Sequence, residues 1–294
     1  MGVDLGGTKT EVLVLDAAGE TAYRERFPTP AADYPAIIEI IATEHARAVA
    51  RFGDALTVGI GVPGALSPRT GLLRNSNTQS LNGQPLKADL ESRLGCEVRM
   101  ANDANCFALS EALGGAGRGH RVVFGVIIGT GTGGGLVIDG RLLDGPHAIS
   151  GEWGHNPLPW WRDDDGAHDC YCGKRACIET FLSGPGFARH YRERHGGERD
   201  SHAILQAAGE GDADSRAMLE RYCDQMARAL AHVINIVDPD AIVLGGGMSN
   251  IESIYSAVKA RLPEYVFSDF VATPLLRAER GDASGVFGAA CLWG

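Results

Sequence analysis

The chain begins with MGVDLGGTKTEVLVLD (residues 1–16), and residues 122–139 repeat this layout as VVFGVIIGTGTGGGLVID. In both stretches an apolar run leads into a turn of glycine and threonine, and a second apolar run follows. Short apolar runs bounded by such turns are typical of paired, buried strands. The repetition predicts two similarly built halves with a cleft between them, and we place their boundary near residues 114–120.

Helical and strand patterns alternate along the rest of the chain. Apolar residues at helical spacing predict helices over residues 34–51, 86–94, 104–113, 214–237, 251–262 and 284–292. Apolar runs predict buried strands over residues 57–62, 97–100 and 241–244. Strands separated by helices indicate an α/β fold. We expect a smaller first domain of residues 1–116, joined by the C-terminal helix of about residues 284–294, and a larger second domain of residues 117–283.

The composition disfavours several classes of partner. Among its 294 residues the chain carries 37 acidic and 27 basic side chains, which gives a formal net charge of −10. A nucleic acid or an anionic membrane requires a basic surface, so neither is an expected partner. No stretch approaches the ~20 apolar residues of a membrane span, and the N-terminus lacks the layout of a signal peptide. Seven cysteines without a disulfide pattern are typical of a reduced, cytoplasmic protein.

A cluster of cysteines follows the second hairpin. The segment Cys170-Tyr-Cys172-Gly-Lys-Arg-Ala-Cys177 contains Gly, Lys and Arg and has no apolar period, so burial in a core does not explain its cysteines. Three thiolates and one imidazole complete a tetrahedral zinc shell with no position open to water, which indicates a structural ion. Two histidines compete for the fourth position: His155 and His168, of which His168 is nearer in the sequence.

Polar side chains near this cluster suit a ligand with many hydroxyl groups. Glu152 and Glu179 lie three and two residues from candidate zinc ligands, so a zinc-bound loop would fix both carboxylates in space. Asn77, in a polar loop, offers both a donor and an acceptor to such a ligand. An ordinary polar turn explains Asn77 equally well.

Three glycine-rich turns are candidates for binding phosphate groups. Asp4-Leu-Gly6-Gly7-Thr8-Lys9, Gly129-Thr130-Gly131-Thr132 and Gly245-Gly246-Gly247 each accompany an apolar run. The backbone amides of a glycine turn approach an anion closely, and threonine adds a hydroxyl donor. The third turn would instead admit a flat nucleobase against bare backbone. One such turn is common without a ligand, but three in one chain predict a nucleotide site, with Asp4 holding a metal–phosphate complex through water.

The pair Asn102-Asp103 stands at the end of a predicted strand and at the start of a predicted helix. Asn and Asp are favoured N-cap residues, so a helix cap explains the pair without any chemistry. A carboxylate at this place is also suited to accept the proton of a hydroxyl group that attacks a γ-phosphoryl group. The two roles are compatible, and Asp103 is the candidate general base.

Together these motifs resemble the ROK family (repressors, open reading frames, kinases), which has the actin/hexokinase-like, ribonuclease H-like fold. The resemblance spans essentially the whole chain and rests on motifs in the family's order: residues 4–9, 61–64, 102–105, 129–131, 151–155, 170–179 and 245–247. It implies two domains that close over Mg²⁺–ATP and a hexose, a structural Zn²⁺ and a homodimer. The chain departs from the family's pattern at Ala176, where a glycine is usual.

The resemblance also implies roles for individual residues. Asp103 is the base that activates the 6-hydroxyl of the sugar. The zinc ligands are His155, whose Glu-x-Gly-His context is the family's, and Cys170, Cys172 and Cys177. The residues that bind sugar hydroxyls are Asn77, Asn102, Glu152, His155 and Glu179. The residues along the phosphates and the adenosine are Asp4, Gly6, Gly7, Thr8, Lys9, Gly129, Thr130, Gly131, Thr132, Gly245, Gly246 and Gly247.

Three segments are similar to the bacterial fructokinase and mannokinase branch of the family: residues 75–85, 151–160 and 170–174. We therefore expect an ATP-dependent kinase of the fructokinase type, which phosphorylates the 6-hydroxyl of fructose or also of mannose. N-acetylglucosamine kinase or glucokinase activity is the alternative. A sugar-responsive ROK regulator is a distant alternative, because regulators carry an extra DNA-binding module before the glycine motif, which here starts at residue 4.

Overall fold

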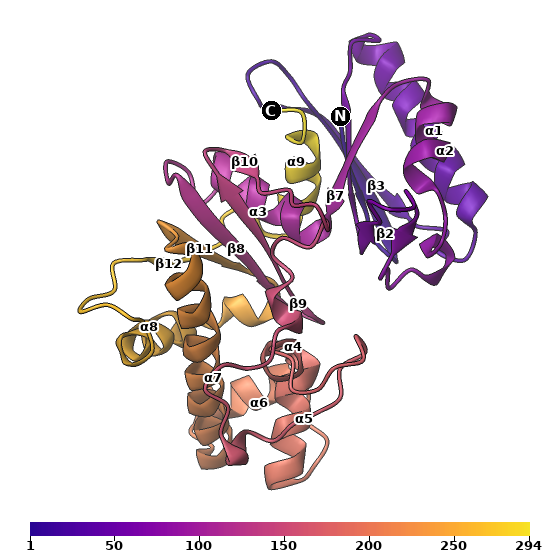
Figure 1. Cartoon of the computed structure of the whole chain (residues 1–294). Helices are drawn as coiled ribbons and strands as arrows, with labels where there is room; N and C mark the ends of the chain where they lie inside the picture. Colours follow the sequence, from indigo (N-terminus) through magenta and orange to yellow (C-terminus); the bar gives the residue numbers. More distant parts are fainter. The chain divides into compact units, whose positions relative to one another are not determined.

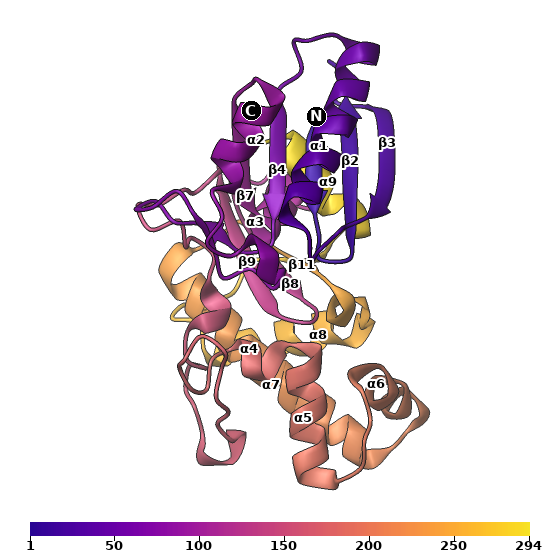
Figure 2. The same cartoon turned by 90° about the vertical axis from the view of Figure 1, so that its right-hand side faces the viewer.

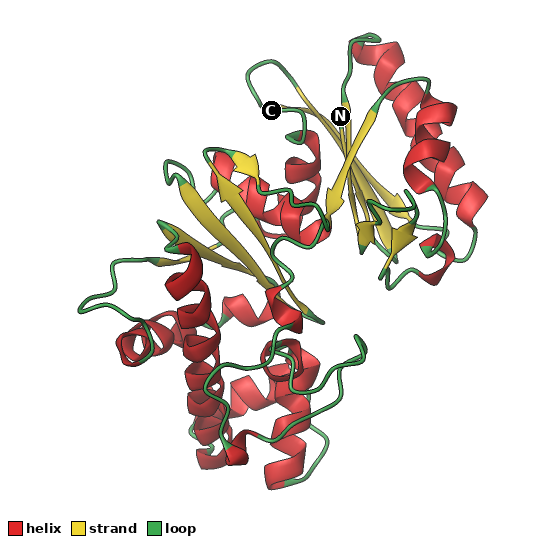
Figure 3. Ribbon diagram, in the orientation of Figure 1, coloured by secondary structure: helices red, strands yellow, loops and turns green.

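A computed structural model describes the backbone of residues 1–294 and every side chain except that of Asp282 (Figures 1 and 3). The chain forms two compact units. The first unit consists of Met1–Arg118, Gly135–Ser150 and Arg280–Gly294, and the second consists of Gly119–Gly134 and Gly151–Glu279. Each unit is described below by itself.

The first unit is built on a five-stranded sheet with the order β3-β2-β1-β4-β7. Its strands are β1 (Gly2–Leu5), β2 (Lys9–Leu15), β3 (Thr21–Pro28), β4 (Val58–Val62) and β7 (Val98–Asn102). β1, β2 and β3 pair antiparallel, whereas β4 and β7 continue the sheet parallel to β1. Because parallel strands have their carboxyl ends at one edge, β1 and β7 deliver Asp4 and Asn102 to the same edge. A short ribbon of β5 (Ala65–Leu66) and β6 (Leu73–Arg74) follows β4.

Two pairs of helices cover this sheet (Figure 1). Their bounds are α1 (Tyr34–Phe52), α2 (Leu86–Leu94), α3 (Asp103–Gly114) and α9 (Ser284–Ala290). α1 and α2 lie together on one face, and α3 and α9 lie on the other. The residues Ile37, Ile38 and Ile41 of α1 are buried in the core, as their helical spacing predicts.

Glycines allow α9 to lie directly against the backbone of its neighbours. A Cβ atom at Gly59 of β4 would overlap the carbonyl oxygen of Ala289, and one at Gly288 would overlap the carbonyl oxygen of Cys106 on α3. No side chain fits at either position, so α9 is wedged between β4 and α3.

A similar close approach explains why Gly135–Ser150 belongs to the first unit, which the sequence did not indicate. A Cβ atom at Gly135 would lie 2.8 Å from the Cβ of Ala108 on α3. The segment that leaves the second hairpin therefore packs on the helix that carries Asp103. The expected boundary at residue 116 did not include this return of the chain.

The fully buried carboxylate of Glu111 ties α3 to the start of α9. Its Oε1 accepts hydrogen bonds from the Arg280 amide at 3.1 Å and from the Ser284 hydroxyl at 2.9 Å. Its Oε2 accepts a hydrogen bond from the Ala116 amide at 3.0 Å. These bonds connect the C-terminal end of α3 to two other segments, so the helix that begins at Asp103 is held in a defined orientation.

The second sheet also has five strands, with the order β10-β9-β8-β11-β12. Its strands are β8 (Val122–Ile128), β9 (Thr132–Ile138), β10 (Arg141–Leu142), β11 (Ala241–Gly245) and β12 (Leu275–Arg277). β8, β11 and β12 are parallel, and β9 and β10 pair antiparallel. The boundary between the two compact units passes through β9.

Five helices belong to the second unit: α4 (Glu179–Leu182), α5 (Gly184–His195), α6 (Ser201–Glu210), α7 (Ala213–Val237) and α8 (Glu252–Arg261). α5, α6 and α7 pack side by side (Figure 2), and α8 packs against β12. Short polar caps begin α6 and α7, where Asp200 accepts from the amide of Ala203 and Asp212 from that of Ser215. Among the helices that the structure describes, none is long and apolar enough to cross a membrane.

A buried ion pair fastens the loop that precedes the cysteine cluster to α7. The side chains of Asp165 and Arg228 are each 1% exposed, and two nitrogens of Arg228 donate to the two carboxylate oxygens at 2.8 Å. Gln225 and the Arg162 amide also donate to this carboxylate, at 3.0 and 2.8 Å. Burial opposes ionisation of Asp165, but the hydrogen bonds outweigh it and lower its pKa to about 2.

The substitution Asp165→Asn should destabilise the second unit, because it leaves the guanidinium of Arg228 buried without its main counter-ion. We expect a loss of about 3 kcal/mol in the free energy of unfolding, measured by urea unfolding with tryptophan fluorescence. The exposed neighbour Asp163 supplies the matched control, and Asp163→Asn should change the free energy by less than about 0.5 kcal/mol. Equal stability of the two variants would contradict the anchoring role of Asp165.

Candidate active site and metal centre

The turn between β1 and β2 is held in place by Thr29. The Gly6 amide donates to the Lys9 carbonyl at 3.0 Å, which closes the turn. The Thr29 hydroxyl donates to the Gly6 carbonyl at 2.8 Å, and the Thr29 amide donates to the Thr8 carbonyl at 3.0 Å. A glycine turn fixed through its carbonyl groups is suited to present amides to an anion.

Two carboxylates lie near each other beside this turn, Asp4 at the end of β1 and Asp103 at the start of α3. Burial, followed by repulsion from Asp103 and Glu11, raises the pKa of Asp4 to about 6. A Cβ atom at Gly285 of α9 would lie 2.6 Å from Asp4 Oδ2, so α9 packs directly on this carboxylate. The side chain of Asp103 is exposed to water at the surface of the unit. The pKa of Asp103 is nevertheless raised, because the surrounding protein displaces bulk solvent that would stabilise the charged carboxylate.

Asn102 caps α3 and binds the neighbouring loop. Its Oδ1 accepts from the Ala104 amide at 2.9 Å, and its Nδ2 donates to the Gly64 carbonyl at 3.1 Å. Asp103 Oδ1 also accepts from the Ala104 amide, at 2.8 Å. The helix terminus that Asn102 caps also orients the carboxylate of Asp103, so a capping role is compatible with the predicted role of Asp103 as a base.

Gly64 brings the loop that carries Asn77 next to the first turn. Its φ is +90°, and a Cβ atom there would overlap the carbonyl oxygen of Arg74. Asn77 is exposed, and its Oδ1 lies 4.0 Å from the position of a Cβ at Gly7. The hydroxyl of Thr78 lies 3.1 Å from the same position and was not predicted. This loop thus places an amide side chain beside the turn, as a site for a hydroxylated ligand requires.

The turn between β8 and β9 holds the carboxylate of Glu179. The Gly129 amide donates to the Gly131 carbonyl at 2.9 Å, and the Gly184 amide donates to the Gly129 carbonyl at 2.8 Å. The Thr132 amide donates to Glu179 Oε2 at 3.0 Å. A residue predicted to bind sugar is therefore joined to a turn predicted to bind phosphate.

The third glycine turn follows β11. Gly246 has a φ of +83°, and a Cβ atom there would lie 2.5 Å from the carbonyl oxygen of Ile128, so only glycine fits. A Cβ atom at Gly247 would meet nothing within 4 Å, which leaves bare backbone as a nucleobase would need. The nucleotide roles of Gly245, Gly246, Gly247 and Thr130 stay predictions.

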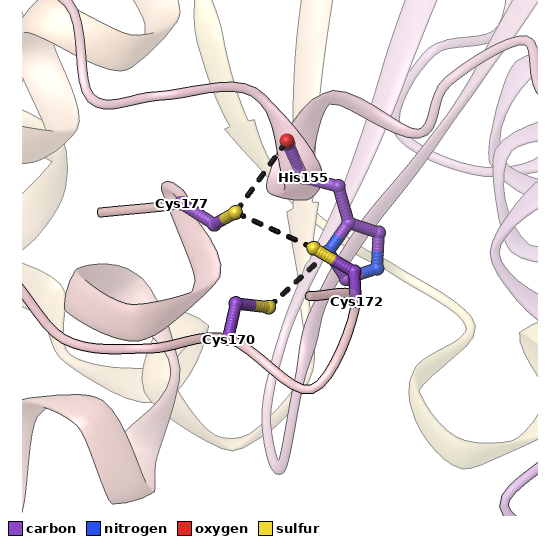
Figure 4. A group of neighbouring side chains, drawn as sticks. All are labelled: His155, Cys170, Cys172 and Cys177. Atoms are coloured by element: carbon purple, nitrogen blue, oxygen red, sulfur yellow. Dashed lines mark hydrogen bonds between the residues drawn. The ribbon is translucent and has the colours of Figure 1, made fainter. Parts of the chain in front are cut away.

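The four predicted zinc ligands converge on one point (Figure 4). His155, Cys170, Cys172 and Cys177 each place one ligand atom within 4.8 Å of the others. His155 Nδ1 lies 3.6 Å from Cys170 Sγ, and Cys172 Sγ lies 3.6 Å from Cys177 Sγ. Tetrahedral zinc, with bonds of about 2.3 Å to sulfur and 2.0–2.1 Å to nitrogen, places ligand atoms about 3.5–3.8 Å apart. The donor set and its spacing fit zinc, and His155 is the histidine that faces the cysteines.

Tyr171, which was not predicted to be a site residue, contacts the histidine of this cluster. Its hydroxyl lies 3.0 Å from His155 Nε2, and the two rings meet edge to face at 5.1 Å. Although Tyr171 is 76% exposed, displacement of bulk solvent by the surrounding protein and the negative charges of Glu179 and Glu152 raise its pKa. The nitrogen of His155 that points away from the cysteines therefore contacts Tyr171.

Each unit thus gathers its own part of the predicted site. The residues gathered in the first unit are Asp4, Gly6, Gly7, Thr8, Lys9, Asn77, Asn102 and Asp103. The residues gathered in the second are Gly129, Thr130, Gly131, Thr132, Glu152, His155, Glu179, Gly245, Gly246 and Gly247, with the three cysteines. Chemically, the first set places two carboxylates beside a glycine turn, and the second places carboxylates beside a loop that a metal ion would fix.

Comparison with known proteins gives a family match over the whole chain. The model of the ROK family matches residues 1–294. An N-acetyl-D-glucosamine kinase of Escherichia coli O139:H28 (strain E24377A / ETEC) is 40% identical over 296 residues, which cover 99% of this chain and 98% of that protein. An N-acetyl-D-glucosamine kinase of Salmonella heidelberg (strain SL476) has the same identity and coverage.

Solved structures match the fold. A ROK hexokinase from Thermus thermophilus superposes with a TM-score of 0.88 at 30% identity, covering 99% of this chain and 96% of that one. A ROK family glucokinase from Streptomyces griseus, solved with glucose and AMPPNP, superposes with a TM-score of 0.76 at 28% identity, covering 99% and 97%. The predicted α/β fold of the hexokinase-like type is confirmed by these likenesses.

Ala176→Gly should strengthen the metal centre. Ala176 has a φ of +56°, a left-handed conformation that costs an L-residue about 1–2 kcal/mol. Glycine removes this cost, but its unfolded chain has more conformational freedom, which offsets about 0.4–1 kcal/mol of the gain. We expect zinc affinity to rise about two- to fivefold, measured by competition with a chromogenic chelator. Ala167→Gly, outside the left-handed region, is the control and should not tighten binding. Unchanged affinity in Ala176→Gly would show that the backbone there is not strained.

Proposed function

Because the chain belongs to the ROK family, we propose that it is an ATP-dependent N-acetylglucosamine kinase that phosphorylates the 6-hydroxyl of its sugar. The observation that carries the proposal is the 40% identity, over 99% of this chain, to N-acetyl-D-glucosamine kinases. The broader assignment, a sugar kinase that transfers phosphate to an alcohol group, rests on the family match and on these relatives.

The substrate proposed here is not the fructose that three loop segments favoured. Identity that extends along the whole chain is a stronger indication than similarity within three short segments. The relatives and structures named above are N-acetyl-D-glucosamine kinases, a hexokinase and a glucokinase. N-acetylglucosamine, the alternative at the outset, therefore becomes the main proposal. Glucose is the second candidate, because the Streptomyces griseus glucokinase is 28% identical over 99% of this chain.

Asp103 is the proposed general base. As the sugar O6 attacks the γ-phosphorus of ATP, the O6 proton passes to the Asp103 carboxylate, and the bond from that phosphorus to the bridging oxygen breaks to release ADP. The raised pKa of Asp103 supports this role, because a stronger base accepts the proton more readily near neutral pH. The Ala104 amide, which donates to Asp103 Oδ1 at 2.8 Å, stabilises the ionised form before the reaction.

Asp4 is the proposed carboxylate for the magnesium ion of Mg²⁺–ATP. When bound, Mg²⁺ neutralises charge that develops on the phosphate oxygens. The residues fit such an ion, because a cation would relieve the burial and the repulsion from Asp103 and Glu11 that raise the pKa of Asp4 to about 6. The turn of Gly6–Lys9, which follows Asp4 directly, would then present its amides to the phosphates.

In the second unit, the metal centre supports the proposed sugar-binding residues. The zinc shell that the geometry fits has no open position, so the ion would fix the loop and take no part in the reaction. Glu152 and His155 lie on that loop, and Glu179 follows its last cysteine by two residues. The hydrogen bond from the Thr132 amide orients the carboxylate of Glu179. These groups provide acceptors for the hydroxyl groups of a sugar.

A coupled assay of ADP release with Mg²⁺–ATP should show the largest kcat/KM with N-acetylglucosamine. Glucose, fructose and mannose should be turned over at lower kcat/KM, because their C2 substituents or ring forms differ from the acetamido sugar. The assay compares the four sugars with the zinc-containing protein. The highest kcat/KM with fructose would overturn the proposed substrate and restore the first expectation.

Asp103→Asn should lower kcat by roughly 10²–10⁴-fold, because the amide cannot accept the proton from O6. Sugar affinity, measured by calorimetry, should stay within a few-fold of the unaltered protein. Asp89→Asn on α2 is a control carboxylate outside the proposed site, and it should leave kcat unchanged. A kcat within a few-fold of normal in Asp103→Asn would remove Asp103 from the mechanism.

A further inference from the structure

We propose that His168, His190 and Glu193 form a second metal site, for a first-row divalent transition metal ion such as Zn²⁺. Each of these residues places one possible ligand atom within 4.8 Å of the other two. His190 and Glu193 are three residues apart on α5 and so lie on one side of the helix, and His168 comes from the loop before the cysteine cluster. Two imidazoles and one carboxylate are a frequent donor set for zinc and its neighbours.

The ring of His190 is buried in a way that a metal ion would explain. The residue is 2% exposed, and its Nε2 atom has no hydrogen-bond partner among the residues that the structure describes. A buried polar nitrogen without a partner is costly. The ring is held by stacking on Phe181 at 5.0 Å and by an edge-to-face contact with His168 at 4.7 Å. The nitrogen thus belongs to a fixed ring and needs a partner.

His168 and Glu193 lie slightly closer together than two ligands of one ion, so a small opening of the pair would admit a metal ion. His168 Nε2 lies 3.0 Å from Glu193 Oε2. The same nitrogen is buried and has no well-aligned hydrogen-bond partner within the described part of the chain. Nitrogen and oxygen ligands of tetrahedral zinc, bonded at about 2.0–2.1 Å, lie about 3.3–3.4 Å apart. The side chain of Glu193 is 48% exposed, so an ion can enter from solvent and a water molecule can complete its shell.

Two guanidinium groups lie near the proposed site, and the charge of one of them, Arg221, is compensated by carboxylates. Arg221 lies near His190, but it forms ion pairs with Asp164 at 2.7 Å and with Asp165 at 3.3 Å. Arg189, the other neighbouring guanidinium, donates to the carbonyl oxygen of Thr180 at 2.9 Å. Glu193 is the single anionic ligand of the proposed site, so the affinity for a cation should depend strongly on it.

This site differs from the cysteine cluster in its donors, because it contains no thiolate. It would join α5 to the loop that enters the cysteine cluster, since His168 precedes Cys170 by two residues. Gly166 lies beside both imidazoles, since a Cβ atom there would be 3.7 Å from the His190 ring and 4.0 Å from His168 Nε2. An ion at this place would therefore bind the loop and the helix together and raise the melting temperature.

The test uses Co²⁺ as a spectroscopic probe on the full-length protein that already contains one equivalent of zinc. We expect one further equivalent of Co²⁺ to bind and to produce visible d–d absorption without the intense near-ultraviolet band of a thiolate–cobalt bond. The melting temperature should rise in the same titration. Absence of a second equivalent, or a thiolate band showing that cobalt has entered the cysteine cluster, would overturn the proposal.

Substitutions then assign the ligands. Glu193→Gln and His168→Gln should each weaken Co²⁺ binding roughly tenfold or more, with the first zinc retained by metal analysis. Both side chains reach the surface, so these variants should fold, and their melting temperatures without cobalt check this. Glu198→Gln, an exposed carboxylate that pairs with Arg192, is the matched control and should bind cobalt normally. Undiminished binding in the double variant of His168 and Glu193 would refute the site.

Discussion

Direct contact between backbones, which glycine alone permits, determines how the first unit is built. At Gly59 and Gly288 the chain passes so close to α9 and α3 that a single methyl group would not fit. This closeness places the start of α9 against the carboxylate of Asp4, with Gly285 at the point of contact. α3 in turn packs on α9 and carries Asp103 at its first position. The raised pKa of Asp4, caused first by its burial and then by repulsion from Asp103, follows from packing that excludes side chains.

The second unit relies on polar rather than steric constraints. The segment from Trp160 to Glu179 contains little regular structure, and polar interactions hold it at both ends. Asp165 binds Arg228 of α7 before the cysteines, and Glu179 accepts from the Thr132 amide after them. Between these points lie His168 and the three cysteines, which each belong to one of the two clusters of possible metal ligands. A long loop with this many polar groups would be mobile without the ion pair and the hydrogen bond at its ends, because it buries little apolar surface of its own.

The sequence predicted elements well where the apolar pattern was continuous. The strand at Val122–Ile128 and the helix at Leu86–Leu94 have the predicted bounds, and α1 and α7 differ by one residue at one end. The edge strand Thr21–Pro28 was missed because its largely polar, exposed residues give no apolar run. The helix Gly184–His195 was missed because it opens with Gly-Pro-Gly and is rich in arginine. Within the candidate site, the roles of the individual residues stay predictions, and only the fold reveals that Tyr171 contacts His155 and that Glu179 binds the second turn. Short loop similarity was also too local a signal to choose among sugars.

The last fifteen residues, Arg280–Gly294, belong to the same compact unit as the first strand. During synthesis, the strands β1, β2, β4 and β7 leave the ribosome long before α9 exists. At about 5–20 residues per second, the ~160 residues between Arg118 and Arg280 take on the order of ten seconds or more. Throughout that interval, the face of the sheet around Gly59 lacks the helix that covers it. The nascent chain therefore displays an uncovered apolar surface until α9 has been made, and a transiently exposed surface of this kind favours aggregation.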